Sequence, residues 1–355
     1  MTRPRRGLLA AVTGCVAVLA VVGAVTLIHR AHGRSETGSP AASAAPARTG
    51  PAPAAPPLGT CTFADEPIPG EPGGLGSGVH SDRDGKVWAI PAGRGFDLYL
   101  GGAPRRVTAP PNLAPSFTAV NARGDVLGGD SYKPWVYRDG AFHEMPLPAG
   151  TSEVRDARMN RRGDVVVLLG FAGPSGELSG MRVAVWPAAM PPALTVFELP
   201  RATATLGGIT DDGMVAAAYK TVVDGRTVSG AVAWLPDGSR RDLPTVGGDT
   251  SMADVNGDWI VGGSARWNVR TGSLDHVSGI LVRRVDKFGR IFGEAPDLAP
   301  PHPAVWVNGT VTWLPTDPER PFGMMGEVSL DGTRITSTLQ ADNPPDPRNV
   351  VWTCK

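Results

Sequence analysis

Cysteine, histidine and net charge are all scarce in this chain, and each shortage excludes a class of site. The 355 residues include 3 cysteines and 6 histidines. No Cys-x-x-Cys pair occurs and the histidines are scattered, so the sequence predicts no metal site and no cofactor. The 34 basic residues equal the 34 acidic ones, and this balance predicts no nucleic-acid partner. A Gly-x-Ser-x-Gly nucleophile elbow is missing as well, so we predict no catalytic residue.

Long apolar runs are also few, and one stands near the N-terminus. Residues 1–6 carry three arginines and are predicted to form a cytoplasmic tail. Residues 7–28 are uncharged and mostly apolar. About 20 such residues cross the hydrocarbon core of a bilayer, so we predict a single-pass signal anchor. The basic start places the N-terminus inside and the rest of the chain outside the cell membrane.

Three processed forms of this segment stay open beside the uncleaved anchor. Cys15 ends a Val-Thr-Gly-Cys stretch that resembles a lipoprotein cleavage box. Arg5 and Arg6 resemble the start of a twin-arginine signal, and cleavage near Ala31 is a third alternative. Residues 29–59 follow, rich in Ala, Pro, Ser and Gly, and they predict a disordered, extended linker between the membrane and the next domain.

One motif then recurs through residues 60–355. It reads Asx-x-x-Gly-x-Val in its clear copies, beginning at Asp82, Asn121 and Asn160, and weaker copies begin at Thr210, Asp254, Asp286 and Ser329. Successive motif glycines are 32 to 50 residues apart, a period typical of propeller blades. Asx and Gly favour a tight turn because both tolerate positive φ. The motif glycines are Gly85, Gly124, Gly163, Gly213, Gly257, Gly289 and Gly332.

An aromatic residue follows each turn at a similar distance, and several copies then end in Leu-Pro. We predict an all-β fold, a single β-propeller of about seven four-stranded blades, in which these aromatics pack between blades. A β-sandwich or an open solenoid is the alternative, but closure removes exposed strand edges. The aromatics are Tyr99, Trp135, Trp186, Trp234, Trp267, Trp306 and Trp352.

The second and fourth copies carry a family resemblance. Residues 233–248 (Ala-Trp-Leu-Pro-Asp-Gly and onward) and 121–128 (Asn-Ala-Arg-Gly-Asp-Val-Leu-Gly) resemble the HAF-repeat bacterial extracellular proteins. The resemblance spans about residues 76–352. The namesake His-Ala-Phe is absent, and Gly-Ala-Val-Ala at 230–233 stands near its place. The resemblance implies a secreted or surface propeller-like array, and it supplies no catalytic residue.

The two cysteines outside the anchor flank the repeats. The last copy ends at Trp352 and lacks a fourth strand, which residues 59–63 are able to supply, because propellers often complete the last blade with a strand from the other terminus. Cys61 and Cys354 would then be neighbours, and we predict a disulfide between them, with Cα atoms within about 7 Å.

Charge recurs at one further repeat position, five residues before each motif glycine. Four of these seven positions are ionisable, namely His80, Arg158, Arg284 and Glu327. The position falls at the start of the innermost strand, where the central channel opens, so we predict a binding site there. A solvated loop face without a ligand is the competing interpretation.

These observations predict a membrane-anchored, extracytoplasmic propeller that acts as a binding or scaffold module. Its partner would be an extracellular protein, a glycan or a small ligand, with the membrane contacted through residues 7–28. The alternative is a propeller enzyme, a hydrolase, lyase or cyclase, with its site at the channel mouth. A purely structural spacer is the third possibility.

Overall fold

The computed structural model describes residues 53–66, 79–175, 178–189, 194–199, 204–247, 251–296, 301–320, 322–340 and 348–355. Residues 1–52, with the predicted tail, the predicted anchor, Cys15 and most of the predicted linker, lie outside this set. Within the described ranges the regular structure is entirely β-strand, and no helix there is long and apolar enough to cross a membrane.

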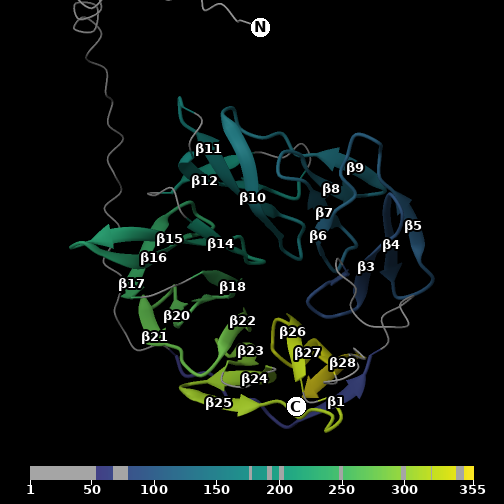
Figure 1. The fold of residues 1–355 in the computed structure, drawn as a ribbon, viewed down its shortest axis with the longest axis vertical. Coiled ribbons are helices and arrows are strands. Elements are labelled where there is room, and N and C mark those ends of the chain that lie inside the picture. The colour runs from purple at the N-terminus through teal and green to yellow at the C-terminus, as the bar shows by residue number, and fades with distance from the viewer. Residues whose placement is uncertain are drawn as a thin grey trace, which may run out of the picture. The chain divides into compact units, whose positions relative to one another are not determined.

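The strands form seven four-stranded antiparallel sheets arranged as blades around a common centre, so the predicted propeller is confirmed (Figure 1). In six blades the four strands follow one another in the chain from the centre outward. The first three are β2 (His80–Ser81), β3 (Val87–Pro91), β4 (Gly95–Leu100) and β5 (Arg105–Thr108); β6 (Phe117–Val120), β7 (Val126–Gly129), β8 (Pro134–Arg138) and β9 (Ala141–Glu144); and β10 (Thr151–Met159), β11 (Val165–Ala172), β12 (Leu178–Trp186) and β13 (Thr195–Glu198). The next three are β14 (Ala204–Ile209), β15 (Val215–Val223), β16 (Arg226–Trp234) and β17 (Arg240–Gly247); β18 (Met252–Asn256), β19 (Trp259–Gly262), β20 (Ala265–Asn268) and β21 (Ser273–His276); and β22 (Leu281–Val285), β23 (Ile291–Ala295), β24 (His302–Val307) and β25 (Thr310–Trp313).

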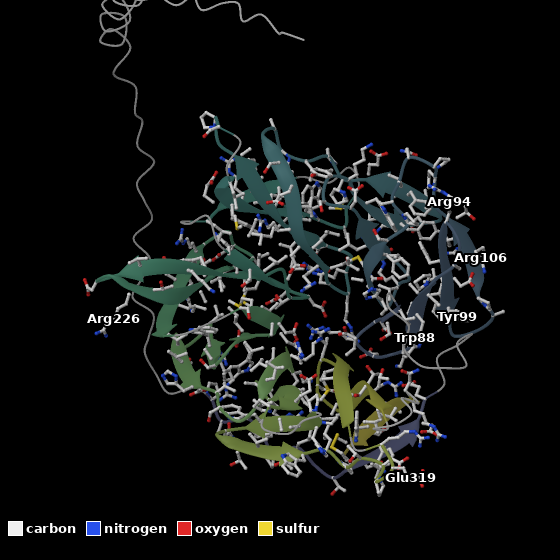
Figure 2. All side chains as sticks on the ribbon, in the orientation of Figure 1. Trp88, Arg94, Tyr99, Arg106, Arg226 and Glu319 are labelled. Atoms are coloured by element: carbon white, nitrogen blue, oxygen red, sulfur yellow. A yellow bond between two sulfur atoms is a disulfide. The ribbon has the colours of Figure 1, made fainter. Side chains whose placement is uncertain are left out.

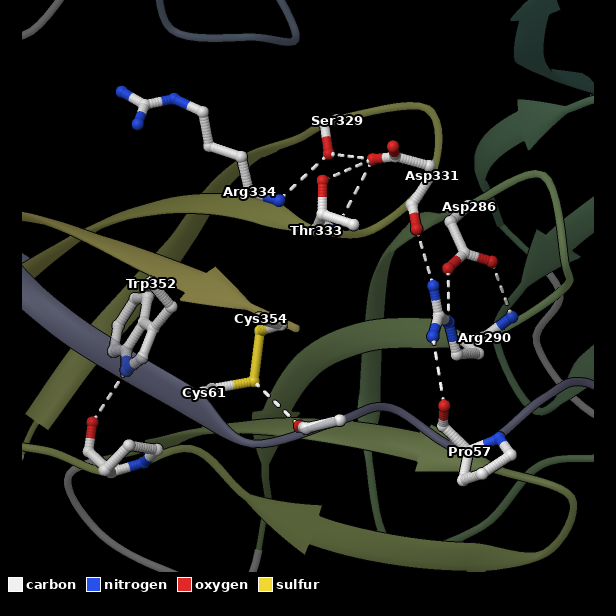
Figure 3. Close-up of a disulfide and its surroundings, with 12 residues drawn as sticks. Pro57, Cys61, Asp286, Arg290, Ser329, Asp331, Thr333, Arg334, Trp352 and Cys354 are labelled. Carbon is white, nitrogen blue, oxygen red and sulfur yellow. Dashed lines mark hydrogen bonds and ion pairs between the residues drawn. A yellow bond between two sulfur atoms is a disulfide. The ribbon is translucent and has the colours of Figure 1, made fainter.

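The seventh blade takes its strands from both ends of the chain. It consists of β26 (Phe322–Val328), β27 (Arg334–Gln340), β28 (Arg348–Cys354) and, as its outer strand, β1 (Cys61–Asp65). β1 pairs with β28 in antiparallel register, with Cys61 opposite Cys354. A disulfide joins the two residues, whose Cα atoms are 4.0 Å apart (Figure 3). The predicted closure and the predicted bond are both confirmed.

The predicted turn residues act as expected in six of the seven copies. All seven motif glycines have φ between 54° and 99°, the region that favours glycine. In the first copy, Oδ1 of Asp82 accepts hydrogen bonds from the N–H groups of Lys86 and Val87, at 2.7 and 2.9 Å. The Gly85 N–H donates to the Asp82 carbonyl oxygen, at 2.9 Å. The side chain thus satisfies backbone donors that the tight turn leaves without strand partners.

The fifth copy is different, and the prediction that Asp254 begins its turn is wrong. β18 continues to Asn256, which pairs directly with Trp259, so only Gly257 and Asp258 form the turn. This shorter hairpin leaves Asp254 inside the strand, where its carboxylate is free for another role.

The aromatic residues lie on the third strand of their blades and are buried, as predicted. The apolar clusters that contain the six tryptophans span neighbouring blades, for example the cluster of Trp267 with residues of β15, β16 and β18–β20. Tyr99 is the exception, because its cluster with Trp88 and Ile90 stays within the first blade. The Trp267 indole N–H donates to the Pro244 carbonyl oxygen at 2.9 Å, and the Trp352 indole N–H to that of Pro315 at 2.7 Å. Both prolines belong to the Leu-Pro end of the preceding copy, so two features of the repeat bind each other across the blade boundary.

The last residues of the predicted linker contact the propeller. Ala55 is 4% exposed. The Asn308 side chain accepts a hydrogen bond from the Ala55 N–H at 3.0 Å and donates one to the Ala55 carbonyl oxygen at 2.9 Å. Arg290 reaches the Pro57 carbonyl oxygen at 3.4 Å (Figure 3). Asn308 itself has φ 48° in the Asn-Gly turn between β24 and β25, so one residue makes both the hairpin and the contact.

Candidate functional site

The innermost strands carry a feature that sequence reasoning missed. In each of blades two to seven the pairing of the first strand with the second shifts at an irregularity of the β-bulge type. In the sixth blade it lies between Val282 and Arg284, and in the seventh between Met325 and Val328. A bulge adds a residue to one strand and changes the direction of nearby side chains. Among the predicted binding residues, Arg284 and Glu327 lie at such an irregularity, whereas Arg158 lies two residues beyond those of its strand and the pairing of His80 has none.

Two of the predicted residues form an ion pair between neighbouring blades. Nη2 and Nε of Arg284, on β22, lie 2.6 and 3.1 Å from Oε1 and Oε2 of Glu327, on β26. The two side chains are 29% and 27% exposed. The Glu327 charge raises the pKa of Arg284. Burial raises the pKa of Glu327, but the charge and the hydrogen bonds of Arg284 lower it by more. The pKa of this carboxyl group therefore lies below its usual value.

The charges of Arg284 and Glu327 also affect the pKa of His80, on β2. Burial lowers its pKa, and the charges of Arg158 and Arg284 act in the same direction, against the opposing effects of Glu327 and of the Phe117 carbonyl group. The imidazole also contacts the Phe117 ring edge to face, with ring centroids 5.5 Å apart. His80 is therefore neutral near pH 7 and lies close to three charges from three other blades.

Arg158, on β10, is the most exposed member of the four. Its side chain is 46% exposed, and its Nη1 lies 3.0 Å from Oδ1 of Asp156. Burial raises the pKa of Asp156, and Arg158 partly opposes that effect. Of the four predicted residues, the structure pairs Arg284 with Glu327 and Arg158 with Asp156, and it leaves His80 within the electrostatic influence of Glu327, Arg158 and Arg284. We call His80, Arg158, Arg284 and Glu327 the mouth cluster.

Other charged residues lie across the centre, and these were not predicted. Arg83, in the first turn, forms an ion pair with Asp254 of the fifth blade and donates to the Val255 carbonyl oxygen at 3.3 Å. Asp84, in the same turn, forms an ion pair with Arg161 of the third blade. The first turn therefore connects blades that are not neighbours in the ring, and Asp254 has this role in place of the predicted turn.

The described residues line a few cavities of very different size. One of about 90 Å³ lies at the centre, among the inner strands and turns, and is lined by Arg83, Arg158 and Arg161 with others. A second of about 90 Å³ lies between the seventh and first blades, beside His80 and Glu327. A groove of about 480 Å³ lies at the outer strands of the fifth and sixth blades, beside His276 and Asn308. No group of three or more His, Cys, Asp or Glu side chains suited to a metal occurs within the described ranges.

Comparison with solved structures shows the fold and nothing of the activity. The chain is similar to the β-propeller domain of the trilobed protease from Pyrococcus furiosus, at 12% identity and a TM-score of 0.51, covering 79% of this chain and 93% of that one. That propeller is described as having an open velcro topology, whereas here β1 completes the seventh blade. Acylaminoacyl peptidase from Pyrococcus horikoshii is similar at 11% identity and a TM-score of 0.48, covering 79% of this chain and 51% of that one. TolB from Acinetobacter baumannii is similar at 12% identity and a TM-score of 0.35, covering 75% of this chain and 78% of that one.

No protein-family model and no curated protein matches the sequence. The resemblance to HAF-repeat proteins stays a prediction that rests on the repeat motifs.

Proposed function

We propose that the protein is a binding module that residues 7–28 attach to the outer side of the cell membrane and that recognises its partner through the mouth cluster. One observation carries the proposal: four ionisable side chains from four blades converge at the centre while Arg158, Arg284 and Glu327 keep part of their surface exposed. Ligand sites are typically concave and use a small number of placed polar or charged groups to orient the ligand.

The charges of the cluster indicate the kind of partner. Two arginines and one glutamate of mixed sign, with a neutral histidine, suit a polar or zwitterionic ligand, whether free or on an extracellular protein or glycan. A polyanion is a poorer match, because the carboxylates of Glu327 and Asp156 would repel it.

Partner capture tests the binding proposal. The Arg158→Ala and Arg284→Ala variants of the full chain are compared with Arg106→Ala, at the outer edge of the first blade (Figure 2), where Arg106 pairs with Asp97 and is 62% exposed. We expect both mouth variants to weaken capture of the partner from an extracellular extract, while Arg106→Ala does not. If Arg158→Ala unfolds the protein, or if capture is unchanged, the cluster is a structural ion network and the proposal fails.

The membrane attachment has its own test. Protease added to intact spheroplasts is expected to remove residues 53–355, because the basic start and the apolar run place them outside. Full protection of the propeller would overturn the proposed topology.

An enzyme is the second candidate, and His80 is the observation that favours it. A neutral imidazole is able to act as a general base and accept a proton from a hydroxyl group of a bound substrate or from a water molecule. Turnover of a glycan or a peptide by the purified protein, lost in His80→Gln, would replace binding with catalysis as the function.

A further inference from the structure

Arg83 lines the central cavity of about 90 Å³, and one nitrogen of its guanidinium group has no hydrogen-bond partner among the described residues. Nη2 of Arg83 donates hydrogen bonds to the Asp254 carboxylate and to the Val255 carbonyl oxygen. Nη1 of the same guanidinium group is buried, and within the described part of the chain it has no hydrogen-bond partner. A buried charged donor without an acceptor is costly, so an acceptor from outside the chain is expected at this atom.

None of the carboxylates that line the cavity accepts a hydrogen bond from this atom. Asp254 accepts from Arg83 and, at 3.0 Å, from the Val285 N–H. Asp82 is occupied by the backbone donors of its turn, and Asp211 accepts the Arg161 N–H at 3.0 Å. Asp254 thus holds the Arg83 guanidinium group in place, and none of the three acids satisfies its Nη1.

A second cation lines the same cavity from another blade. Arg158 lies on β10, and Arg83 follows β2, so the two guanidinium groups border the cavity from different sides of the ring. Arg158 is held by a single acid, Asp156, and 46% of its side chain is exposed. Two guanidinium groups at one cavity are a typical arrangement for a carboxylate, which accepts charge-assisted hydrogen bonds from both.

We propose that the central cavity binds a carboxylate group, which accepts the Nη1–H of Arg83 and contacts Arg158. The volume admits several water molecules or one group the size of acetate, so a larger ligand would place only its carboxylate end there. This inference rests on the proposed binding function, because Arg158 belongs both to the mouth cluster and to this cavity, and it names the chemical class that would be recognised there. A small organic acid and a peptide C-terminus share this chemistry.

Thermal unfolding of the full chain in detergent, with sodium acetate as the probe, tests the proposal. At constant ionic strength, acetate is expected to raise the unfolding temperature in a saturable way, and acetamide, its neutral analogue, is expected to have no effect. A tripeptide with a free carboxyl end, compared with the same tripeptide amidated, distinguishes a peptide terminus from a free acid as the source of the carboxylate.

The diagnostic variant is Arg83→Lys, which keeps the charge and one donor for Asp254 but removes the second donor. Acetate binding is expected to weaken at least about tenfold in this variant. Arg106→Lys is the control and should bind as the parent does. If Arg83→Lys does not fold, Arg158→Gln serves instead, since the half-exposed Arg158 is not part of the folding core, and a weaker acetate effect is again expected.

Each result decides for or against the carboxylate site. Three results would show that the cavity holds only ordered water. The first is no shift of the unfolding temperature at acetate concentrations up to about 100 times a dissociation constant of about 1 mM. The others are an equal effect of acetamide and an unchanged acetate effect in Arg83→Lys. Acetate binding that depends on Arg83, together with partner capture that ignores Arg158 and Arg284, would keep the carboxylate site and overturn the proposed function. Capture that depends on the mouth cluster without any acetate effect would do the reverse.

Discussion

Removal of the Cys61–Cys354 bond is predicted to destabilise the propeller without changing its fold. The bond closes a loop across a sequence separation of 293 residues. In the chain-entropy model, such a loop lowers the entropy of the unfolded chain enough to stabilise the protein by about 5–6 kcal/mol. Measured values are usually smaller, so we expect a loss of about 3–5 kcal/mol. A domain of ordinary stability, about 5–15 kcal/mol, would remain folded or nearly so.

Urea and thermal unfolding of Cys61→Ser, Cys354→Ser and the double variant provide the measurement. A protein of this size loses roughly 2 °C for each kcal/mol, so the unfolding temperature should fall by about 5–10 °C. The dependence on urea should become steeper, because the unfolded chain expands once the loop is open. Both single variants should equal the double variant, since each removes the same bond.

Cys15→Ser is the matched control, and it should leave unfolding unchanged. Additive effects of the two single substitutions would refute the bond as the common cause. An unfolding midpoint in the double variant equal to that of the parent would refute the closure contribution altogether.

Three further predictions follow from local geometry. Gly163→Ala should lower the free energy of unfolding in urea by several kcal/mol, because its Cβ would lie 2.2 Å from Nη2 of Arg138 and 2.5 Å from Oδ2 of Asp125. Gly140→Ala, with similar positive φ and nothing within 4 Å, should lower it by only about 1–2 kcal/mol. Equal losses would contradict the clash. Because burial lowers the pKa of His80, the unfolded state binds its proton more readily, so stability should fall as the pH drops below about 6.5, and His80→Gln should reduce that fall between pH 7.5 and 5.5; an identical pH dependence would contradict the assignment. Asn308→Gly keeps the turn but removes both bonds to Ala55, so hydrogen exchange at the Ala55 amide should accelerate by roughly tenfold while the free energy of unfolding in urea changes by less than about 0.5 kcal/mol; unchanged exchange would contradict the contact.

The sequence predicts those parts of the fold that depend on local conformation or on the repeat itself. The motif glycines are predictable because their turns require positive φ. The repeat period predicts where Trp267 and Trp352 lie in their blades. The last copy lacks a fourth strand, which indicates that β1 completes it. Asp254 was misassigned because its copy has a shorter hairpin, which shifts the residue from turn to strand. The spacing of the repeats does not reveal that one hairpin is shorter than the others.

The centre of the ring is predicted less well, for a different physical reason. The partners Arg83 and Asp254 are 171 residues apart, and their meeting depends on how many blades close the ring. The bulges that redirect inner-strand side chains leave no consistent Gly or Pro signal either. Position five before each glycine located Arg284 and Glu327, but only the closed ring shows that the two form a pair with each other.

The position of the disulfide gives the propeller one more property. In the other six blades the third and fourth strands are consecutive in the chain, and in the seventh the Cys61–Cys354 bond joins them instead. From Cys61 to Cys354 the domain is consequently a covalent circle with no first or last blade. A protease that cuts one loop of this circle opens it without releasing a fragment, and two pieces separate only after a second cut or after reduction. A circular permutant that starts in another outer turn, with Lys355 linked to Gly59, should build the same ring from a different beginning.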